Sequence, residues 1–592
     1  MSELFTRFTE FLQHMFQGGV GNLSVLGNAV PIAGGIIRII MAVLGILILV
    51  RCILSLFGEK NPKEKWGTLS MKNGVQFDLS HWENLIGRGG GSDVVLDFPA
   101  VSRSHATLLR DDKGNWRLHP LQTKNGTFLN GTQVTESVPV EVGDEISVGG
   151  LELYFYPIGE NAEREQERLR SIPERLIDPK ATLLYLTVFQ LLAALQCVLE
   201  VEWSKALPIA ICFGLLCGAT WGLYALYLVF ERTAFEVETL AFFLCTLSFA
   251  VVAAWKPGYL YRQAAAVFLG ILFFLLLSLS LRDLKIAVHL RWPVAAVTCG
   301  LLGINLLFGQ TMFGAKNWVS IGPISFQPSE FVKVAFIFAC AATLDRLFAK
   351  RNLIFTTLYS GFCVGCLALM SDFGTALIFF VAFLVIAFLR SGDLGFLVMM
   401  GAVAAFGCVI ILHFKPYIAN RFAVWHHVWE FASSTGYQQT RTMSAIAGGG
   451  FFGQGGEAAW LKSLGAANTD LVFGVVGQEL GLILALCAAC AILILALFTV
   501  KSAGTSRSSF YTIAACAAAA MLVFQSSLNI FGAVDILPLT GVTLPFVSEG
   551  GSSMIACWGL LAFLKAADTR ARASFTLRRL GPNPAWRGRE YD

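Results

Sequence analysis

Charged residues are scarce in this chain of 592 residues: they make up 14% of it, against 55% for hydrophobic residues. Soluble domains typically have about a quarter of their residues charged, so this scarcity excludes a chain built only of soluble domains. The net charge of +4 is small. Its basic residues lie in loops and in the tail, which favours orientation in a bilayer over nucleic-acid binding.

Clustered metal ligands and a cleavable leader are also missing. All 14 cysteines fall on apolar runs, and the pairs Cys363/Cys366 and Cys487/Cys490 have no second pair beside them. We therefore expect neither a disulfide framework nor a zinc site. Residues 1–24 have no basic start and no Ala-x-Ala cleavage site, so no removable signal peptide is indicated.

Apolar runs near 20 residues recur along the chain, which is the length needed to cross a hydrocarbon core of ~30 Å. We predict a polytopic α-helical membrane protein with about 13 transmembrane helices. The first covers about residues 32–56, where Arg38 and Arg51 must reach the interface or find a partner. Twelve more begin near residues 183, 207, 238, 262, 286, 329, 353, 373, 395, 471, 509 and 544.

Residues 66–157 interrupt this pattern. Apolar and polar residues alternate there, as in Leu151–Phe155, and Gly and Asn turns separate the runs. This alternation predicts a small all-β sandwich inserted between membrane helices. The charged residues 160–180 that follow are expected to form a juxtamembrane linker or a surface helix.

The even number of helices after the sandwich puts the sandwich and the tail on the same side of the membrane. Most of the basic residues lie in loops on that side, so the positive-inside rule makes it the cytoplasm. The same parity brings four polar loops together on the outer face, namely those bearing Trp318, Asp372, Asp470 and Glu549.

Four short motifs mark the sandwich: Gly87-Arg88, Ser102-Arg103-Ser104-His105, Asn125-Gly126-Thr127-Phe128 and Gly143-Asp144-Glu145. In order and spacing they resemble a forkhead-associated (FHA) domain, which implies a phosphothreonine-binding site. The resemblance implies that Arg88 and Ser102 contact the phosphate and that Asn125 binds the peptide backbone.

Arg103 and Lys124 complete this predicted site, and Lys124 keeps a charge compatible with phosphate where many family members have Ser or Thr. An arginine fork and a hydroxyl suit a doubly charged phosphate, because both form charge-assisted hydrogen bonds to it. The alternative is a sandwich that has lost ligand binding.

Three further motifs open apolar helices: Trp318-Val319-Ser320-Ile321-Gly322 with Gln327-Pro328-Ser329-Glu330, Asn468-Thr469-Asp470, and Pro545-Phe546-Val547-Ser548-Glu549-Gly550-Gly551. With the helices from about residue 238 onward, they resemble the RodA/FtsW (SEDS) family of membrane peptidoglycan polymerases. The resemblance implies a core of ten helices and a glycosyltransferase that polymerises lipid II outside the cytoplasmic membrane of a bacterium.

Asp470 is the predicted catalytic residue, because the resemblance implies that the Asp of the Thr-Asp motif is needed for catalysis. A sugar hydroxyl is a poor nucleophile, so a carboxylate must accept its proton as it attacks the anomeric carbon. A general base and a ligand for a divalent cation, Mg²⁺ or Mn²⁺, both fit, and no other cofactor is expected. The structural alternative is a carboxylate that stabilises a helix N-terminus, with Thr469 as the cap.

Lys333 follows Glu330 by one helical turn, so the two can form a salt bridge while Lys333 faces the bundle. The resemblance links Lys333 to a central cavity, where its charge would meet the diphosphate of the substrate. A purely structural ion pair is the alternative. Asp372 opens a helix in Ser371-Asp372-Phe373-Gly374, where capping and a partnership with Lys333 are both open.

Glu479, Arg421 and Ser548 complete the predicted substrate cavity. Glu479 lies nine residues after Asp470 on what reads as one helix, which puts it on the opposite face and ~13 Å deeper; hydrogen-bonded packing is its alternative role. The glycine-rich residues 415–469 are expected to form a flexible interfacial loop.

These motifs predict a peptidoglycan glycosyltransferase regulated through phosphothreonine recognition. The alternatives are a lipid II transporter and a phosphorylation-dependent membrane scaffold. The chain has no Ser-x-x-Lys with Lys-Thr-Gly, the motifs of serine acyl transfer, so the implied partner is a class B penicillin-binding protein that supplies transpeptidation. A phosphothreonine protein or peptide from a Ser/Thr kinase pathway is the second implied partner.

The expected order of domains is an N-terminal transmembrane helix with its flanks (1–65), the FHA-like sandwich (66–157), a charged linker (158–182), two additional transmembrane helices (183–235), the membrane glycosyltransferase core (236–567) and a basic cytoplasmic tail (568–592).

Overall fold

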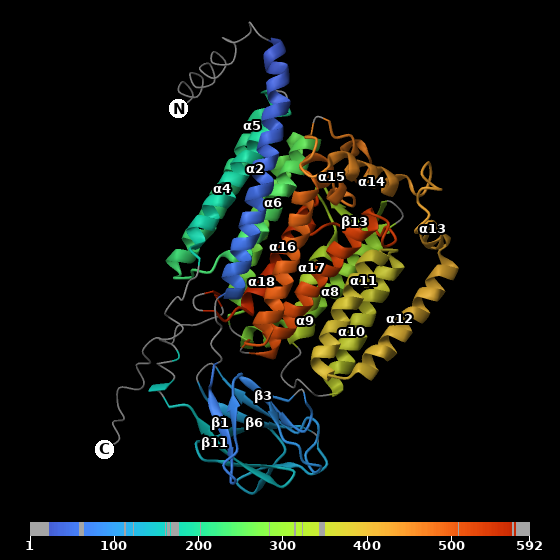
Figure 1. Ribbon diagram of the computed structural model, residues 1–592. Helices are drawn as coiled ribbons and strands as arrows, with labels where there is room; N and C mark the ends of the chain where they lie inside the picture. The colour runs from blue at the N-terminus through green and yellow to red at the C-terminus, as the bar shows by residue number, and fades with distance from the viewer. Residues whose placement is uncertain are drawn as a thin grey trace.

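An α-helical bundle stands on a β-sandwich in the computed structural model (Figure 1). The structure describes residues 23–58, 64–90, 92–111, 114–121, 123–159, 161–162, 166, 177–201, 203–282, 284–312, 315–322, 324–342, 350–456, 458–506, 508–570 and 573–575. The region 1–22, most of the predicted linker 158–182 and most of the predicted tail 568–592 lie outside the described residues.

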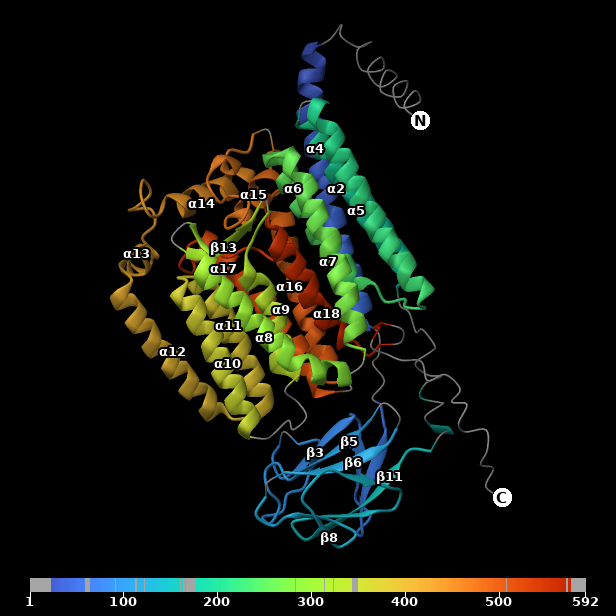
Figure 2. The ribbon, with the colours of Figure 1, turned by 180° about the vertical axis from the view of Figure 1, so that it is seen from behind.

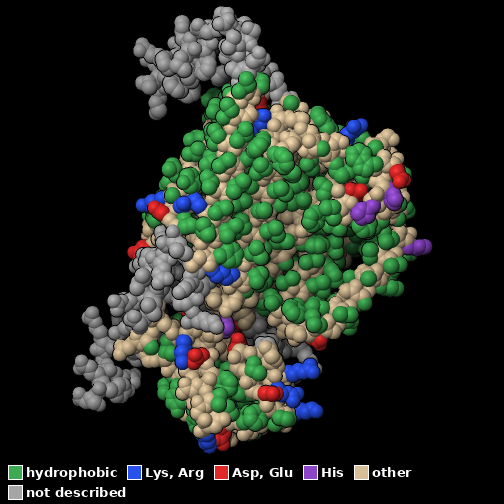
Figure 3. Space-filling view, viewed as in Figure 1, with side chains coloured by type: hydrophobic (Ala, Val, Ile, Leu, Met, Phe, Trp, Pro, Cys, Tyr) green, Lys and Arg blue, Asp and Glu red, His purple; other side chains and the backbone are tan. Residues whose placement is uncertain are grey.

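The bundle confirms the predicted α-helical membrane fold. Ten helices within the described residues have the length and hydropathy needed to cross a membrane, and α10 and α18 are shorter apolar helices. Hydrophobic side chains cover the middle of the bundle, while charged ones gather towards its ends and on the sandwich (Figure 3). The long helices and their shorter partners are α2 Leu23–Gly58, α4 Pro179–Leu199, α5 Trp203–Val229, α6 Glu236–Trp255, α7 Leu260–Ser280, α8 Leu284–Phe308, α9 Pro328–Ala342, α10 Lys350–Leu369, α11 Phe373–Ser391, α12 Leu394–Phe414, α16 Leu482–Ala503, α17 Ser509–Ala533 and α18 Gly551–Ala566.

One predicted span is broken. The run from residue 471 forms α15 (Val472–Glu479) and then α16, with Gly481 at φ +97° between them. A Cβ on Gly481 would lie 2.3 Å from the carbonyl oxygen of Phe451, so the close approach of another backbone requires glycine at the break. The single helix predicted from Asp470 past Glu479 is therefore wrong.

The residues 415–469, predicted to be a flexible loop, instead contain three short helical elements joined by turns. These are α13 Pro416–Val424, α14 Tyr437–Gly449 and the 3₁₀ turn η4 Leu461–Ser463. Beside them lie the turn η2 Pro257–Tyr259 and a small antiparallel sheet of β12 Gln310–Met312, β13 Ala315–Ile321 and β14 Ile324–Phe326, in the order β12-β13-β14.

Helices α2, α4 and α5 form a layer along one side of the bundle (Figures 1 and 2). The two arginines of α2 have found partners, as predicted. Arg51 donates to the Thr182 hydroxyl (3.0 Å) and to the Asp178 carbonyl (3.2 Å). Arg38 donates to the Phe452 carbonyl (3.1 Å).

The inserted domain confirms the predicted all-β sandwich. One sheet has the order β2-β1-β11-β10-β7-β8 and the other the order β4-β3-β5-β6-β9. Alternate residues of both sheets fill its core, where the rings of Trp116 and Phe155 meet edge to face at 5.1 Å. The strands are β1 Gly67–Met71, β2 Gln76–Leu79, β3 Glu83–Gly87, β4 Val94–Val95, β5 Ala106–Arg110, β6 Trp116–Pro120, β7 Thr127–Leu129, β8 Thr132–Val134, β9 Val138–Val140, β10 Glu145–Val148 and β11 Leu151–Pro157.

The sandwich contacts the bundle at the start of α17. The Glu83 carboxylate accepts hydrogen bonds from the Ser508 hydroxyl (3.1 Å) and from the Ser509 backbone N–H (3.2 Å) and hydroxyl (2.7 Å). A carboxylate is favourable there because the helix dipole is positive at its N-terminus. Thr505 bonds Thr569 after α18 (3.1 Å), so the sandwich and the residues after α18 lie at the same end, as helix parity predicts.

Candidate active site

A cavity of about 1150 Å³ opens at the end of the bundle away from the sandwich. Apolar side chains of α11 and α12 line one part of it, and polar side chains from the loops and α17 line another. Trp318, Asp372, Asp470 and Glu549 all line it, so the predicted convergence of four loops is confirmed.

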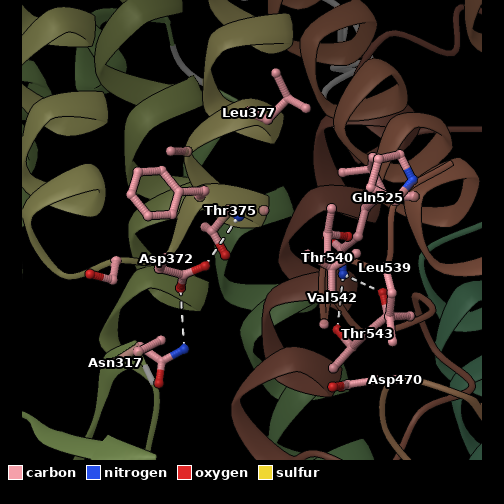
Figure 4. A pocket seen from close by; sticks show the side chains of 18 of the residues that line it. Asn317, Asp372, Thr375, Leu377, Asp470, Gln525, Leu539, Thr540, Val542 and Thr543 are labelled. Atoms are coloured by element: carbon pink, nitrogen blue, oxygen red, sulfur yellow. Dashed lines mark hydrogen bonds between the residues drawn. The ribbon is translucent and has the colours of Figure 1, made fainter. Parts of the chain in front are cut away.

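Asp470 lies on the loop before α15, across the cavity from Asp372 (Figure 4). Burial raises the pKa of the Asp470 carboxyl above its ordinary value, and the charge of Asp372 adds to this rise. The Thr469 hydroxyl and the positive charge of Arg421 oppose it. A shielded carboxylate that still faces a cavity is suited to accept a proton near neutral pH.

The geometry contradicts the capping alternative for this motif. Helix α15 begins at Val472, and its N-cap is Leu471, which makes no side-chain cap bond. The Thr469 hydroxyl donates to the Ala466 carbonyl instead (3.2 Å). Neither Thr469 nor Asp470 therefore caps α15 with its side chain, and the Asp470 carboxylate lies at the cavity instead.

Two buried side chains form hydrogen bonds to the backbone carbonyls of Thr469 and Asp470. Ser548 donates to the Thr469 carbonyl (2.6 Å), and Asn529 of α17 donates to the Asp470 carbonyl (2.9 Å). The same Asn529 amide donates to the Val542 carbonyl (2.7 Å). Because both side chains are almost fully buried, they fix the loop against α17 and the chain before α18.

Asp372 is the N-cap of α11, where it accepts a hydrogen bond from the Thr375 N–H (3.2 Å). It also accepts bonds from the side chains of Asn317 (3.3 Å) and Gln327 (3.2 Å). Figure 4 shows the bond between Asn317 and Asp372. Asp372 is thus held by α11, by Asn317 of β13 and by Gln327 just before α9, and the hydrogen bonds of its carboxylate do not include Lys333.

Lys333 forms the predicted salt bridge with Glu330 (2.7 Å), and both side chains line the cavity while remaining buried. Its ammonium also donates to the Gln525 side-chain oxygen (2.9 Å). The Gln525 amide donates in turn to the carbonyl and hydroxyl of Thr543. The Lys333 ammonium is therefore a fixed positive charge in the wall of the cavity, held by Glu330 and by Gln525 of α17.

The remaining predicted residues are placed differently from one another. Arg421 lines the cavity and donates to the Leu539 carbonyl (3.0 Å). Glu479 and Ser548 do not line it. Ser548 instead donates a hydrogen bond to the Thr469 carbonyl. Glu479 is buried at the end of α15, and its Oε1 has no hydrogen-bond partner among the described residues. The structure thus does not bring Glu479 to Asp470.

Several buried polar atoms of residues that line the cavity have no hydrogen-bond partner within the described part of the chain. They include Asn317 Oδ1, Asn468 Oδ1 and Thr540 Oγ1. Buried polar groups are nearly always satisfied in folded proteins. Such atoms at one cavity are suited to a ligand rich in hydroxyl and amide hydrogens.

In the sandwich, the predicted residues lie on three adjacent loops. Two hydrogen bonds join these loops. The Arg88 backbone N–H donates to the Ser102 carbonyl (2.9 Å), and the Asn125 side-chain amide donates to the Ala100 carbonyl (2.7 Å). Arg88, Arg103 and Lys124 are exposed. The three cations therefore form one positively charged edge, which suits a doubly charged phosphate.

Two residues of the site escaped sequence reasoning. Gln525 holds Lys333 and Asn529 holds Asp470, and both lie on α17. A signal was present, since two amides one turn apart on an apolar helix are expensive in a membrane and share one face. Their partners are far away in the chain, so the signal does not say what they bind.

Comparison with known proteins adds the following. Residues 235–573 match the model described as FtsW/RodA/SpoVE cell cycle protein, and residues 84–149 match the FHA domain. A probable peptidoglycan glycosyltransferase FtsW of Tolumonas auensis is 33% identical over 286 residues, 46% of this chain and 74% of the relative. One of Borreliella burgdorferi is 30% identical over 322 residues, 52% of this chain and 85% of the relative. A solved chain described as "Structural coordination of polymerization and crosslinking by a peptidoglycan synthase complex" is 29% identical, with 57% of this chain and 98% of that chain covered and a TM-score of 0.49.

Proposed function

This chain belongs to the FtsW/RodA/SpoVE family, and from that premise we propose that it is a peptidoglycan glycosyltransferase that polymerises lipid II in the bacterial cytoplasmic membrane. The relatives named above carry that activity in their names. Lipid II consists of a disaccharide-peptide joined through a diphosphate to a polyprenyl chain, so its site must accept sugar, charge and hydrocarbon together.

The observation that carries the proposal is a carboxylate in a cavity that has both a polar and an apolar part. Asp470 lies in the polar part, with Asn468 on the same loop and Asn317 across the cavity, and the side-chain oxygens of both amides have no hydrogen-bond partner among the described residues. The apolar part includes Val403 and Ile411 of α12, a helix with no fully buried residue. A lightly packed helix beside the lipid suits the entry of a hydrocarbon chain.

In the proposed reaction, a sugar hydroxyl attacks the anomeric carbon that carries the diphosphate of a second lipid-linked chain. A new C–O bond forms, the bond from that carbon to the diphosphate breaks, and Asp470 accepts the hydroxyl proton. General-base catalysis of this kind contributes ~10²–10⁴-fold in rate. The cations of Lys333 and Arg421 stabilise the diphosphate that leaves.

A divalent cation, Mg²⁺ or Mn²⁺, is part of this proposal. Mg²⁺ is commonly bound through one or two carboxylates together with substrate phosphates, and Asp470 and Asp372 line opposite sides of the cavity. A cation held by Asp470 together with the substrate diphosphate would neutralise charge on the leaving group.

We assign the end of the bundle that carries the cavity to the outer face of the membrane, and the sandwich to the cytoplasm. The support is the excess of Lys and Arg in the loops at the sandwich end, according to the positive-inside rule. Because the chain has no serine acyl-transfer motif, a class B penicillin-binding protein is the proposed partner for cross-linking.

Purified chain and lipid II test the activity directly. Wild type should make glycan polymer, and Asp470→Asn should lose at least ~10²-fold of the rate, because it cannot accept the proton. Asp393→Asn is the matched control, since this Asp caps α12 by accepting a bond from the Gly395 N–H. Lipid II translocation in vesicles without any polymer would favour a transporter instead, and near wild-type activity of Asp470→Asn would contradict the role of that carboxylate.

We further propose that the FHA domain reads phosphothreonine at the edge formed by Arg88, Arg103 and Lys124. Full-length chain should bind a phosphothreonine peptide, and Arg88→Ala should weaken binding ~10- to 100-fold, since bonds to charged groups contribute about 1.5–3 kcal/mol. Arg117→Ala is the control, because that side chain bonds Ser137 on another part of the sandwich. Equal affinity for the unphosphorylated peptide in calorimetry is the outcome that rules out phosphate reading.

A further inference from the structure

The layer of α2, α4 and α5 lies outside residues 235–573, which match the family model. Helix α2 packs against α4 and also against α6 and α16 of the core. Polar contacts from this added layer converge on one short stretch of the core, residues 452–456, which follows α14 and leads towards Asp470.

Arg38 is the first of these contacts. It is buried within α2, with the side chain 10% exposed, and its Nε donates to the Phe452 carbonyl (3.1 Å). Its Nη1 lies 3.8 Å from Glu200 Oε1 at the end of α4. A buried arginine is costly in a membrane unless it is paired, so this one has been placed where both the loop and α4 satisfy it.

Glu200 is the second contact. It accepts a hydrogen bond from the Gln196 amide (2.5 Å), and its carboxylate lies against the backbone of Gly455 and Gly456. A Cβ on Gly455 would lie 2.5 Å from Glu200 Oε1 and 2.8 Å from Arg38 Nη1, and a Cβ on Gly456 would lie 2.6 Å from Glu200 Oε2. The two glycines therefore let the backbone approach the ion pair closely.

On its other side this stretch is bonded to the end of α15. The Gln454 N–H donates to the Gln478 carbonyl (2.9 Å), and the Gly455 N–H donates to the Glu479 carbonyl (3.0 Å). The Gln478 side chain then accepts a bond from the Leu461 N–H (3.0 Å). The chain before Asp470 is thus held between the added helices and α15, the helix that begins immediately after Asp470.

We propose that Arg38 and Glu200 are positioning residues, and that the added helices clamp residues 452–456, where the loop towards Asp470 begins, so that Asp470 keeps its place in the cavity. The predicted effect on the polymerisation rate rests on the proposed function. The predicted restraint of the loop does not, so it is measured separately, by hydrogen exchange.

The test uses the full-length chain and three variants of the clamp: Arg38→Ala, Glu200→Gln and Gly455→Ala. The last keeps both charges but adds a methyl group where space is lacking and where the backbone, at φ +84°, favours glycine. Arg51→Ala is the matched control, because Arg51 also joins α2 to α4, through Thr182 and Asp178, but makes no contact with this loop in the described residues.

Amide hydrogen exchange of residues 452–470 should rise at least ~3-fold in each clamp variant and stay at the wild-type value in Arg51→Ala. In the polymerisation assay kcat should fall ~10-fold or more with KM within ~2-fold, since misplaced catalytic groups cost rate rather than binding. Arg38→Lys keeps the charge and should recover part of kcat.

Unchanged exchange in the clamp variants, or an equal rise in Arg51→Ala, would overturn the proposal. A rise in KM with kcat unchanged would do the same for the positioning role. If the wild-type chain makes no polymer at all, the proposed function fails, whereas the exchange measurement still decides whether the clamp exists.

Discussion

Asn529→Leu is the substitution that most directly tests how Asp470 is held. Asn529 is 1% exposed, and its amide donates to the carbonyls of Asp470 (2.9 Å) and Val542 (2.7 Å). Leucine has a similar size but no donor, so both carbonyls lose their bond while the volume is kept. At about 0.5–1.5 kcal/mol for each net hydrogen bond, the loss is about 1–3 kcal/mol.

If this loss falls on the transition state, the rate decreases roughly 5- to 150-fold, because each 1.36 kcal/mol is about a factor of ten. The assay is lipid II polymerisation by purified Asn529→Leu, with the melting temperature measured in the same detergent. Ser527→Ala is the control on the same helix, since the Ser527 hydroxyl donates only to the Val523 carbonyl of its own helix (2.9 Å). A rate within twofold of wild type, while Asp470→Asn remains inactive, would refute the idea that Asn529 positions the carboxylate.

Two further predictions concern charge. Asp470 accepts a proton only when it is ionised, so the rate should fall as the pH drops through its pKa; because that pKa is raised, the acidic limb of the pH–rate profile should lie above the ordinary value of 3.8. A limb at or below 3.8 would contradict this assignment. Lys333→Ala should reduce polymerisation more than Lys333→Arg, since arginine keeps the charge that meets the diphosphate. Recovery of activity in the double variant Glu330→Ala/Lys333→Ala would instead assign the buried pair a structural role.

The helices and the sandwich could be predicted because their signals are local. Runs of about 20 apolar residues and strict alternation each correspond to one kind of element, whatever the rest of the chain does. The break after Glu479 could not be predicted in this way. The break depends on the close approach of the Phe451 backbone to Gly481. The sequence of the run from residue 471 does not predict that contact.

The predicted site followed a similar division. Sequence motifs and helix parity were enough to bring Asp372 and Asp470 to one region, because parity assigns every loop to an end of the bundle. Motifs and parity did not distinguish the residues that line the cavity from those that pack behind the lining. Glu479 was expected in the cavity, but it is buried at the end of α15 and is not among the lining residues.

By itself, the sequence determined that this protein is a helical membrane enzyme core of the FtsW/RodA/SpoVE type with an FHA domain, and that Asp470 is its candidate base. Only the tertiary structure decided what holds that base: Asn529 and Ser548 behind it, and Arg38 and Glu200 beside the loop that precedes it. The physical reason is distance along the chain. Arg38 bonds a carbonyl 414 residues away, and such a pair acquires its meaning only when packing has brought the helices together.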